Sequence, residues 1–154
     1  MNTLQLKIPP PVYLLTFMGV MWFVNAWLPL FHWIAAPWNR LGLLLIVVAV
    51  VVDFWSLGLF FRAHTTFNPI HPERTKALVT TGPYRYTRNP MYVGMLVILT
   101  GWGIWLGGLS PFLVLPLFVW VLTVEQIIPE EKILEQTFGG AYRDYKAHVR
   151  RWLW

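Results

Sequence analysis

The sequence predicts an all-α integral membrane protein with about four transmembrane helices, folded as one domain over residues 1–154. Hydrophobic residues make up 56 % of the chain and charged residues only 12 %, against roughly 25 % charged residues in a typical soluble domain. Apart from Asp53 and Glu125, the charges also lie between long apolar runs rather than within them. So few charges cannot cover a surface in water, and we therefore expect the helices to lie in lipid.

Four apolar runs have the length and composition of membrane-spanning helices. The stretch from Met91 to Val124 carries no charge and is too long for one helix, so we divide it at Gly107-Gly108 and Ser110-Pro111 into a tight hairpin. Glycine in such a hairpin allows two helices to pack closely. The four predicted spans are residues 12–34, 41–61, 90–106 and 111–128.

The polar parts of the chain are a loop at 62–89 and two C-terminal helices within 129–152. Pro129 is expected in the first turn of the first C-terminal helix, which should end at Gly139-Gly140. The second helix is amphipathic, with Tyr142, Tyr145, Val149 and Trp152 on one face, and we expect it at the membrane interface. Basic residues gather in the loop and the C-terminal tail, so the termini and the loop should face the cytoplasm.

Charge and residue content exclude several classes of function. The net charge is +5, but the basic residues flank apolar spans, which indicates contact with anionic membrane lipids and no nucleic acid. The absence of cysteine excludes thiolate metal ligands and a cysteine nucleophile. The four histidines have no metal-ligand spacing, so we expect no metal site.

The densest group of polar residues surrounds Arg88, Asn89 and Pro90. Asn89 is a possible N-cap for a helix that begins at Pro90, and the helix N-terminus beside Arg88 would attract a carboxylate or a phosphate. The alternative is that Arg88 and the nearby Arg85 contact only lipid head groups.

Three other features have a functional and a structural interpretation. Glu130 and Glu131 either bind a cation or ribose hydroxyls, or complement the dipole of a helix start. Gly101 and Gly103 allow close approach of either a ligand or another helix. Asp53 is a carboxylate inside a predicted span, and a charged group in such a position indicates a functional role. The alternative is that Asp53 forms a hydrogen bond to another span, for which Asn25 is a candidate partner.

Two ordered motifs resemble the isoprenylcysteine carboxyl methyltransferase family and, more broadly, the membrane phospholipid methyltransferases. They are Arg88-Asn89-Pro90-Met91-Tyr92-Val93-Gly94, preceded by Gly82-Pro83-Tyr84, and the later Glu130-Glu131 with Phe138-Gly139 and Tyr142. The resemblance covers about residues 65–152. Asn89 stands where the family motif has histidine, so this position cannot titrate.

The resemblance implies S-adenosylmethionine-dependent methyl transfer to an amphiphilic acceptor, lipid-like or prenylated, that reaches the enzyme from the membrane. It implies that Arg88 and Glu130 act in catalysis. The implied cofactor-binding residues are Tyr84, Arg88, Asn89, Pro90, Tyr92, Gly94, Gly101, Gly103, Glu130 and Glu131. Two alternatives stay open: a nicotinamide-dependent membrane reductase, and a non-catalytic lipid-binding scaffold.

Overall fold

The structure is a computed structural model that describes residue 6 and residues 8–28, 30–63 and 77–154. All regular elements in these ranges are helical, apart from two isolated β-bridges, so the predicted all-α class is confirmed. The α-helices are α1 (Pro10–Trp27), α2 (Leu41–Arg62), α3 (Pro90–Leu106), α4 (Leu115–Leu122), α5 (Ile128–Phe138) and α6 (Gly140–His148). Short 3₁₀ segments lie at Trp38–Arg40, Gly82–Arg85 and Ser110–Val114, and a π-helical turn lies at Thr123–Ile127.

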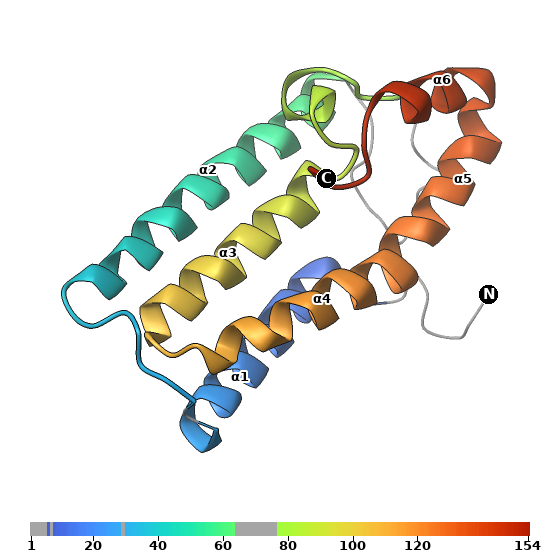
Figure 1. Cartoon of the computed structure of the whole chain (residues 1–154). Helices are drawn as coiled ribbons and strands as arrows, with labels where there is room; N and C mark the ends of the chain where they lie inside the picture. Colours follow the sequence, from blue (N-terminus) through green and yellow to red (C-terminus); the bar gives the residue numbers. More distant parts are fainter. Residues whose placement is uncertain (1–5, 7, 29, 64–76) are drawn as a thin grey trace.

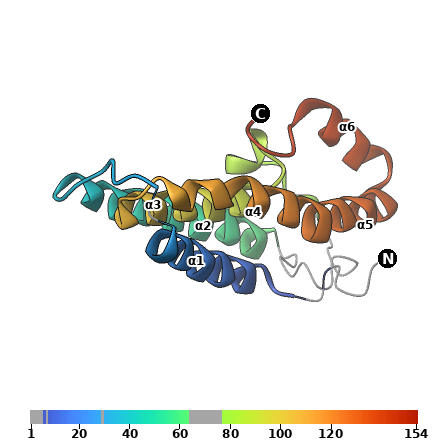
Figure 2. The same ribbon diagram turned by 60° about the horizontal axis from the view of Figure 1, so that its bottom comes forward.

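The long helices lie side by side and alternate in direction along the chain. Figure 1 shows α2, α3 and α4 next to one another, and Figure 2 shows α1 on one side of this layer and α6 raised over the α5 end. α2 packs along α3, while α1 packs against α3 and the segment Ser110–Val114. The core lies between α1, α3 and α4, where Phe17 and Phe118 meet edge to face at 5.2 Å.

Glycines set the close contact between α2 and α3. A Cβ atom added to Gly101 would lie 2.6 Å from the carbonyl oxygen of Gly42 and 2.8 Å from Cγ1 of Ile46. No side chain fits at that separation, so the two backbones approach directly, as they do at small-residue interfaces in membranes. Gly103 instead faces Phe112 and Met21, whose nearest atoms would lie 3.0 and 3.2 Å from an added Cβ.

A continuous helical stretch, Ser110–Phe138, replaces the separate fourth and fifth helices that the sequence predicts. α5 begins beside Pro129 as expected, but it follows α4 through the π-helical turn without a break. Pro129 has no N–H to offer the carbonyl of Glu125 four residues earlier. The backbone N–H of Leu6 donates to that carbonyl, at 3.2 Å, and so attaches the N-terminal segment here.

Two helical stretches in the described part of the chain are long and apolar enough to cross a membrane, Trp38–Arg62 and Ser110–Phe138. α3 is equally apolar but has 17 residues. Large apolar side chains on α2 are exposed, which is unfavourable in water and favourable in lipid; they include Leu44, Val47, Val51, Phe54 and Trp55. These features support a membrane location, while four spans, the hairpin as a pair of spans and the orientation stay predictions.

Two predicted elements have different bounds. The first predicted span, 12–34, is a shorter helix that ends at Trp27, because Pro29 follows in the sequence and a proline disfavours helix in the residue before it. The last helix, α6, ends at His148, so Trp152 is not on its face. Trp152 is buried, and its indole N–H donates to the Thr123 hydroxyl at 3.1 Å. Of the predicted loop 62–89, residues 64–76 lie outside the described residues.

Candidate functional site

The segment before α3 pairs with the C-terminal segment of the chain. Thr87 and Arg150 form a parallel β-bridge, and the backbone N–H of Arg88 donates to the Arg150 carbonyl at 2.8 Å. The Thr87 hydroxyl and the Asn89 side-chain amide both donate to the Arg151 carbonyl, at 2.8 and 3.0 Å. These bonds fix the C-terminal segment over the start of α3.

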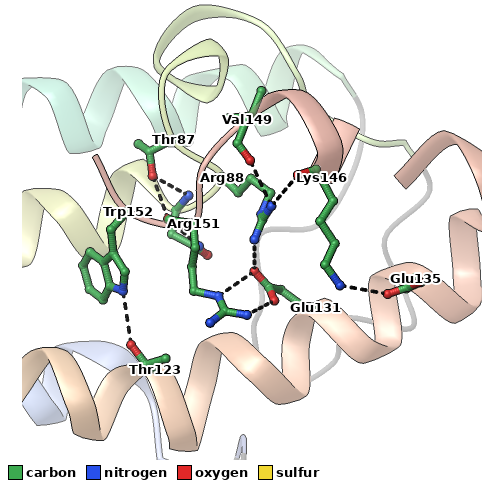
Figure 3. A network of polar contacts seen from close by, with 10 residues as sticks. Thr87, Arg88, Thr123, Glu131, Glu135, Lys146, Val149, Arg151 and Trp152 are labelled. Atoms are coloured by element: carbon green, nitrogen blue, oxygen red, sulfur yellow. Dashed lines mark hydrogen bonds and ion pairs between the residues drawn. The ribbon is translucent and has the colours of Figure 1, made fainter. Parts of the chain in front are cut away.

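Beneath this pairing, Glu131 holds two arginines (Figure 3). Nη2 of Arg88 lies 2.7 Å from Oε1 of Glu131, and both side chains are over 90 % buried, at 8 % and 7 % exposure. Arg151 binds the same carboxylate in a bidentate way, with Nε 3.0 Å from Oε1 and Nη2 2.7 Å from Oε2. These hydrogen bonds to Glu131 raise the pKa of Arg151 above its ordinary value. We call Arg88, Glu131 and Arg151 the charge cluster; its net charge is positive because two guanidinium groups share one carboxylate.

The position of the Arg88 side chain is fixed from several directions. Its Nη1 donates to the carbonyls of Lys146 and Val149, at 3.0 and 2.9 Å, which joins the end of α6 to the charge cluster. The Nε atom is buried and has no hydrogen-bond partner among the described residues. Arg88 therefore keeps one unused donor inside the protein, which costs free energy unless a ligand or water accepts from it.

Glu130 points to a different neighbour from Glu131. Adjacent helical residues face different directions, and Glu130 accepts a hydrogen bond from the Tyr92 hydroxyl, with 3.1 Å between Oη and Oε2. Tyr92 is a buried core residue on the first turn of α3. The two acidic residues of the doublet thus link α5 to two different places on the segment 88–92.

Tyrosines complete the surroundings of the cluster. The Tyr145 hydroxyl donates to the Tyr84 carbonyl at 2.7 Å, and the Tyr84 ring meets Phe60 edge to face at 5.5 Å. Burial raises the pKa of Tyr84, and the negative charges of Glu130 and Asp53 raise it further. Burial also raises the pKa of Tyr145. Both phenols therefore stay protonated and uncharged near neutral pH.

The structure brings together most residues that the sequence singles out. The segment from Tyr84 to Tyr92 and the doublet Glu130-Glu131 lie in direct contact, although Arg88 and Glu131 are 43 positions apart. Asn89 is at the expected place, but its predicted N-cap bond is wrong: its side chain makes no cap bond and holds the Arg151 carbonyl instead.

Three predicted cofactor-binding glycines lie away from the charge cluster. Gly101 is in the contact with α2, Gly103 is in the contact with Phe112 and Met21, and Gly94 lies against the Asp53 side chain. Asn25, which we considered as a partner for Asp53, lies instead against Gly108 beyond the far end of α3. A role of these glycines toward a cofactor stays a prediction.

Sequence reasoning missed Arg151 and Thr87. An arginine near the end of a basic tail looks like any other membrane-surface charge, and only the return of the chain onto α3 reveals its contact with Glu131. No group of three or more His, Cys, Asp or Glu side chains that could hold a metal ion occurs within the described ranges.

Comparison with known proteins places this geometry in context. Residues 38–141 match the model of the family described as phospholipid methyltransferase. The chain is 30 % identical over 119 residues to protein-S-isoprenylcysteine O-methyltransferase A of Arabidopsis thaliana, covering 77 % of this chain and 58 % of the plant protein. It is 36 % identical over 72 residues to protein-S-isoprenylcysteine O-methyltransferase of Schizosaccharomyces pombe, covering 47 % of this chain and 30 % of the yeast protein.

A short protein of Haemophilus influenzae, described as an uncharacterized protein, is 46 % identical over 63 residues, which are 41 % of this chain and all of that protein. The chain spans little more than half the length of the plant relative. The family match covers more than half of the chain, the whole of the first motif and the second motif as far as Gly139, and it confirms the resemblance drawn from them.

Proposed function

Because the chain belongs to the phospholipid methyltransferase family, we propose that it is an enzyme that transfers a methyl group from S-adenosylmethionine to an amphiphilic acceptor in the membrane. The observation that carries this proposal is the contact between the two motifs, in which Glu131 holds both Arg88 and Arg151. Methyl donor, acceptor and protein must meet at one place, and this contact is where distant motifs of the family converge.

The residues at the charge cluster fit the polar parts of the donor. S-adenosylmethionine has an α-carboxylate, a sulfonium, a ribose and an adenine. The cluster has a net positive charge and an unused buried donor at Arg88 Nε, which suits the carboxylate. Glu130, which Tyr92 holds through one oxygen, suits ribose hydroxyls or the positive sulfonium, and the rings of Tyr84 and Tyr92 suit the sulfonium as well.

When bound, the donor supplies an electrophilic methyl group. The chain has to hold the donor, orient its methyl group and keep water away. Alignment of the reacting groups accounts for a large part of the rate acceleration in group-transfer reactions of this kind. Arg88 and Glu131 are almost fully buried, so their positions are fixed before a ligand arrives. Tyr84 and Tyr145 stay protonated and therefore act as hydrogen-bond donors and apolar walls rather than as bases.

The acceptor is proposed to reach the site from the lipid, with the site and both termini on the cytoplasmic side of a multi-pass protein. Basic residues in the loop 62–89 and in the tail favour that orientation. The plant and yeast relatives are named for methyl transfer to an isoprenylcysteine. For this chain we propose the broader class, an amphiphile with a long apolar part, lipid-like or prenylated.

Donor binding tests the proposal. The purified protein in lipid nanodiscs is titrated with S-adenosylmethionine by calorimetry, beside Arg88→Ala, Glu130→Ala and the control Glu135→Ala. Glu135 lies on α5, like Glu130, and forms an exposed ion pair with Lys146 of α6, outside the charge cluster. We expect both site variants to lose at least ten-fold in affinity and the control to bind like wild type.

The same titrations separate the alternatives. Binding of a nicotinamide dinucleotide in place of S-adenosylmethionine would indicate the membrane reductase. Binding of anionic lipid with neither cofactor would indicate the non-catalytic scaffold.

A further inference from the structure

The last residues of the chain run from the charge cluster to the outside of the protein. Arg151 belongs to the cluster, and the next residue, Trp152, is buried and donates to the Thr123 hydroxyl. Leu153 and Trp154, which we call the tail end, are 53 % and 67 % exposed. The ring of Trp154 stacks on Trp152 with 5.8 Å between the centroids. The tail end is thus held at the surface by a residue that directly follows the cluster.

The tail end lies beside a lipid-facing side of the helices. Thr123 is part of the stretch Ser110–Phe138, which is long and apolar enough to cross a membrane. Side chains three positions apart share one side of a helix, and Trp120, three positions before Thr123, is a large exposed apolar residue on that side. The C-terminus lies next to the start of α3 (Figure 1), on the side of the helix layer away from α1 (Figure 2). A tryptophan beside an apolar helix, near the helix end, is typical of a membrane interface.

Two exposed arginines lie near the tail end. Arg150 is paired through its backbone with Thr87, and Arg85 lies two positions before Thr87 in the sequence. Neither arginine forms an ion pair with a carboxylate of the described residues. Tyr86, next to Arg85, is 74 % exposed. Arginine and aromatic side chains next to exposed apolar residues are the chemistry that binds the head groups of anionic lipids.

We propose that Arg85, Arg150 and the tail end dock on an anionic lipid bilayer and that this docking strengthens donor binding at the charge cluster. The inference rests on the proposed methyl transfer and names a regulator of the donor site. Arg151 lies in the sequence between Arg150 and the tail end, so a bilayer that holds both also holds Arg151. A ligand that binds one arrangement of a segment better shifts the population toward it. Here that arrangement is the one in which Arg151 contacts Glu131.

The composition of this surface distinguishes an anionic bilayer from a neutral lipid and from a soluble anion. Two guanidinium groups without a carboxylate favour a negatively charged head group over a zwitterionic one. The two apolar side chains of the tail end would gain nothing from a soluble anion, whereas the acyl region of a bilayer covers them. Both parts of the surface are therefore satisfied by one partner.

Donor titration in nanodiscs of two compositions tests the proposal. The protein is titrated with S-adenosylmethionine by calorimetry in phosphatidylcholine alone, and again with about a third of the lipid replaced by phosphatidylglycerol. We expect about ten-fold tighter binding in the anionic nanodiscs, a usual size for coupled sites. The general attraction of a singly positive donor to a surface at about −30 mV gives only about three-fold. A wild-type ratio no larger than this general attraction would overturn the proposal.

Matched variants separate docking from the general attraction. The measured quantity is the ratio of the two affinities, because a variant that only weakens the fold lowers both affinities. Arg85→Gln combined with Arg150→Gln should lower the ratio to that of the general attraction, and so should serine at both positions of the tail end. The control, Lys132→Gln combined with Arg143→Gln, removes two exposed charges from α5 and α6 and should keep the wild-type ratio. A ratio that is the same in wild type and in both site variants would overturn the proposal.

A soluble anion could supply the same negative charge. Glycerophosphoglycerol is the head group of phosphatidylglycerol without its acyl chains. Its addition to the phosphatidylcholine nanodiscs should leave donor affinity unchanged. A rise in affinity equal to that in the anionic nanodiscs would overturn the bilayer as the partner.

Docking also has a readout that needs no donor. Because the chain has no cysteine, Leu153→Cys carries a single nitrobenzoxadiazole label, and Ala147→Cys, at an exposed position of α6, carries the control label. Phosphatidylglycerol with a doxyl group on its acyl chain should quench the label at 153 more strongly than doxyl phosphatidylcholine does. Arg85→Gln combined with Arg150→Gln should remove this difference, and the label at 147 should not show it. Equal quenching of the label at 153 by the two lipids would contradict docking.

The two readouts keep this inference separate from the methyltransferase proposal. If wild type binds S-adenosylmethionine equally well in both nanodiscs and the label at 153 shows no preference, the docking inference is refuted alone. If wild type binds no S-adenosylmethionine in either nanodisc, the methyltransferase proposal fails together with the regulation of its donor site. The quenching then still decides whether this surface binds anionic lipid.

Discussion

Arg88 and Glu131 are joined by a 2.7 Å ion pair across 43 positions of sequence, and both side chains are almost fully buried. Arg151 completes the pair from the other side of the carboxylate. A buried charge with two partners is stable only while the partners remain, because an unpaired charge in the interior is strongly unfavourable. The charge cluster therefore serves both the fold of this end of the molecule and the proposed donor site.

Glu131→Ala should destabilise the protein by about 3 kcal/mol, since it leaves two arginines without their carboxylate. Thermal unfolding in detergent measures this. The control Glu135→Ala removes an exposed ion pair and should cost less than about 1 kcal/mol. Equal melting temperatures for the two variants would contradict the structural importance of the cluster.

Arg151→Lys should weaken the binding of S-adenosylmethionine about ten-fold, because lysine cannot form the bidentate contact with Glu131. The adjacent Arg150→Lys is the matched control, since Arg150 contributes backbone contacts to the pairing with residues 87 and 88. Calorimetric titration of both variants checks this prediction. A uniform effect of the two substitutions would mean that only the overall basic charge of the tail matters.

Tyr92→Phe removes the hydrogen bond to Glu130 and keeps the buried ring. We expect a loss of roughly 1 kcal/mol of stability together with a several-fold loss of donor affinity, because Glu130 is no longer oriented. Tyr86→Phe, at an exposed tyrosine, should change neither quantity. Donor affinity that is unaltered in Tyr92→Phe would remove Glu130 from the proposed site.

Gly101→Val should separate α2 from α3, because the new side chain would collide with the Gly42 carbonyl. The variant should melt at a lower temperature, and crosslinks engineered between α2 and α3 should fail to form. Gly58→Ala is the control: Gly58 lies in α2 with no atom near an added Cβ, and alanine should stabilise the helix by about 0.5–1 kcal/mol.

The sequence predicted α3 well because both ends carry strong signals. Asn89-Pro90 starts the helix and Gly107, at a left-handed φ of 77°, ends it. The predicted end of the first helix, at residue 34, was wrong, because the apolar run contains Pro29 and the helix ends before it, at Trp27. Composition thus located the helices, but local backbone chemistry set their ends.

The proximity of Arg88 and Glu131 was expected from the family resemblance, and the contact itself comes from the structure. Arg151 was missed because its partner is distant in sequence and its neighbours are ordinary basic residues. The long-range contacts of a tail depend on where the chain returns, which a local pattern does not reveal.

The missing amide of Pro129 has a consequence for the start of the chain. The carbonyl of Glu125 accepts from Leu6, a residue that has a left-handed φ of 60°, which a side-chain-bearing residue adopts only at a cost. An alanine at position 129 would bring a competing amide from the helix itself. A substitution that improves helix geometry would then loosen the opposite terminus, more than a hundred positions away in sequence.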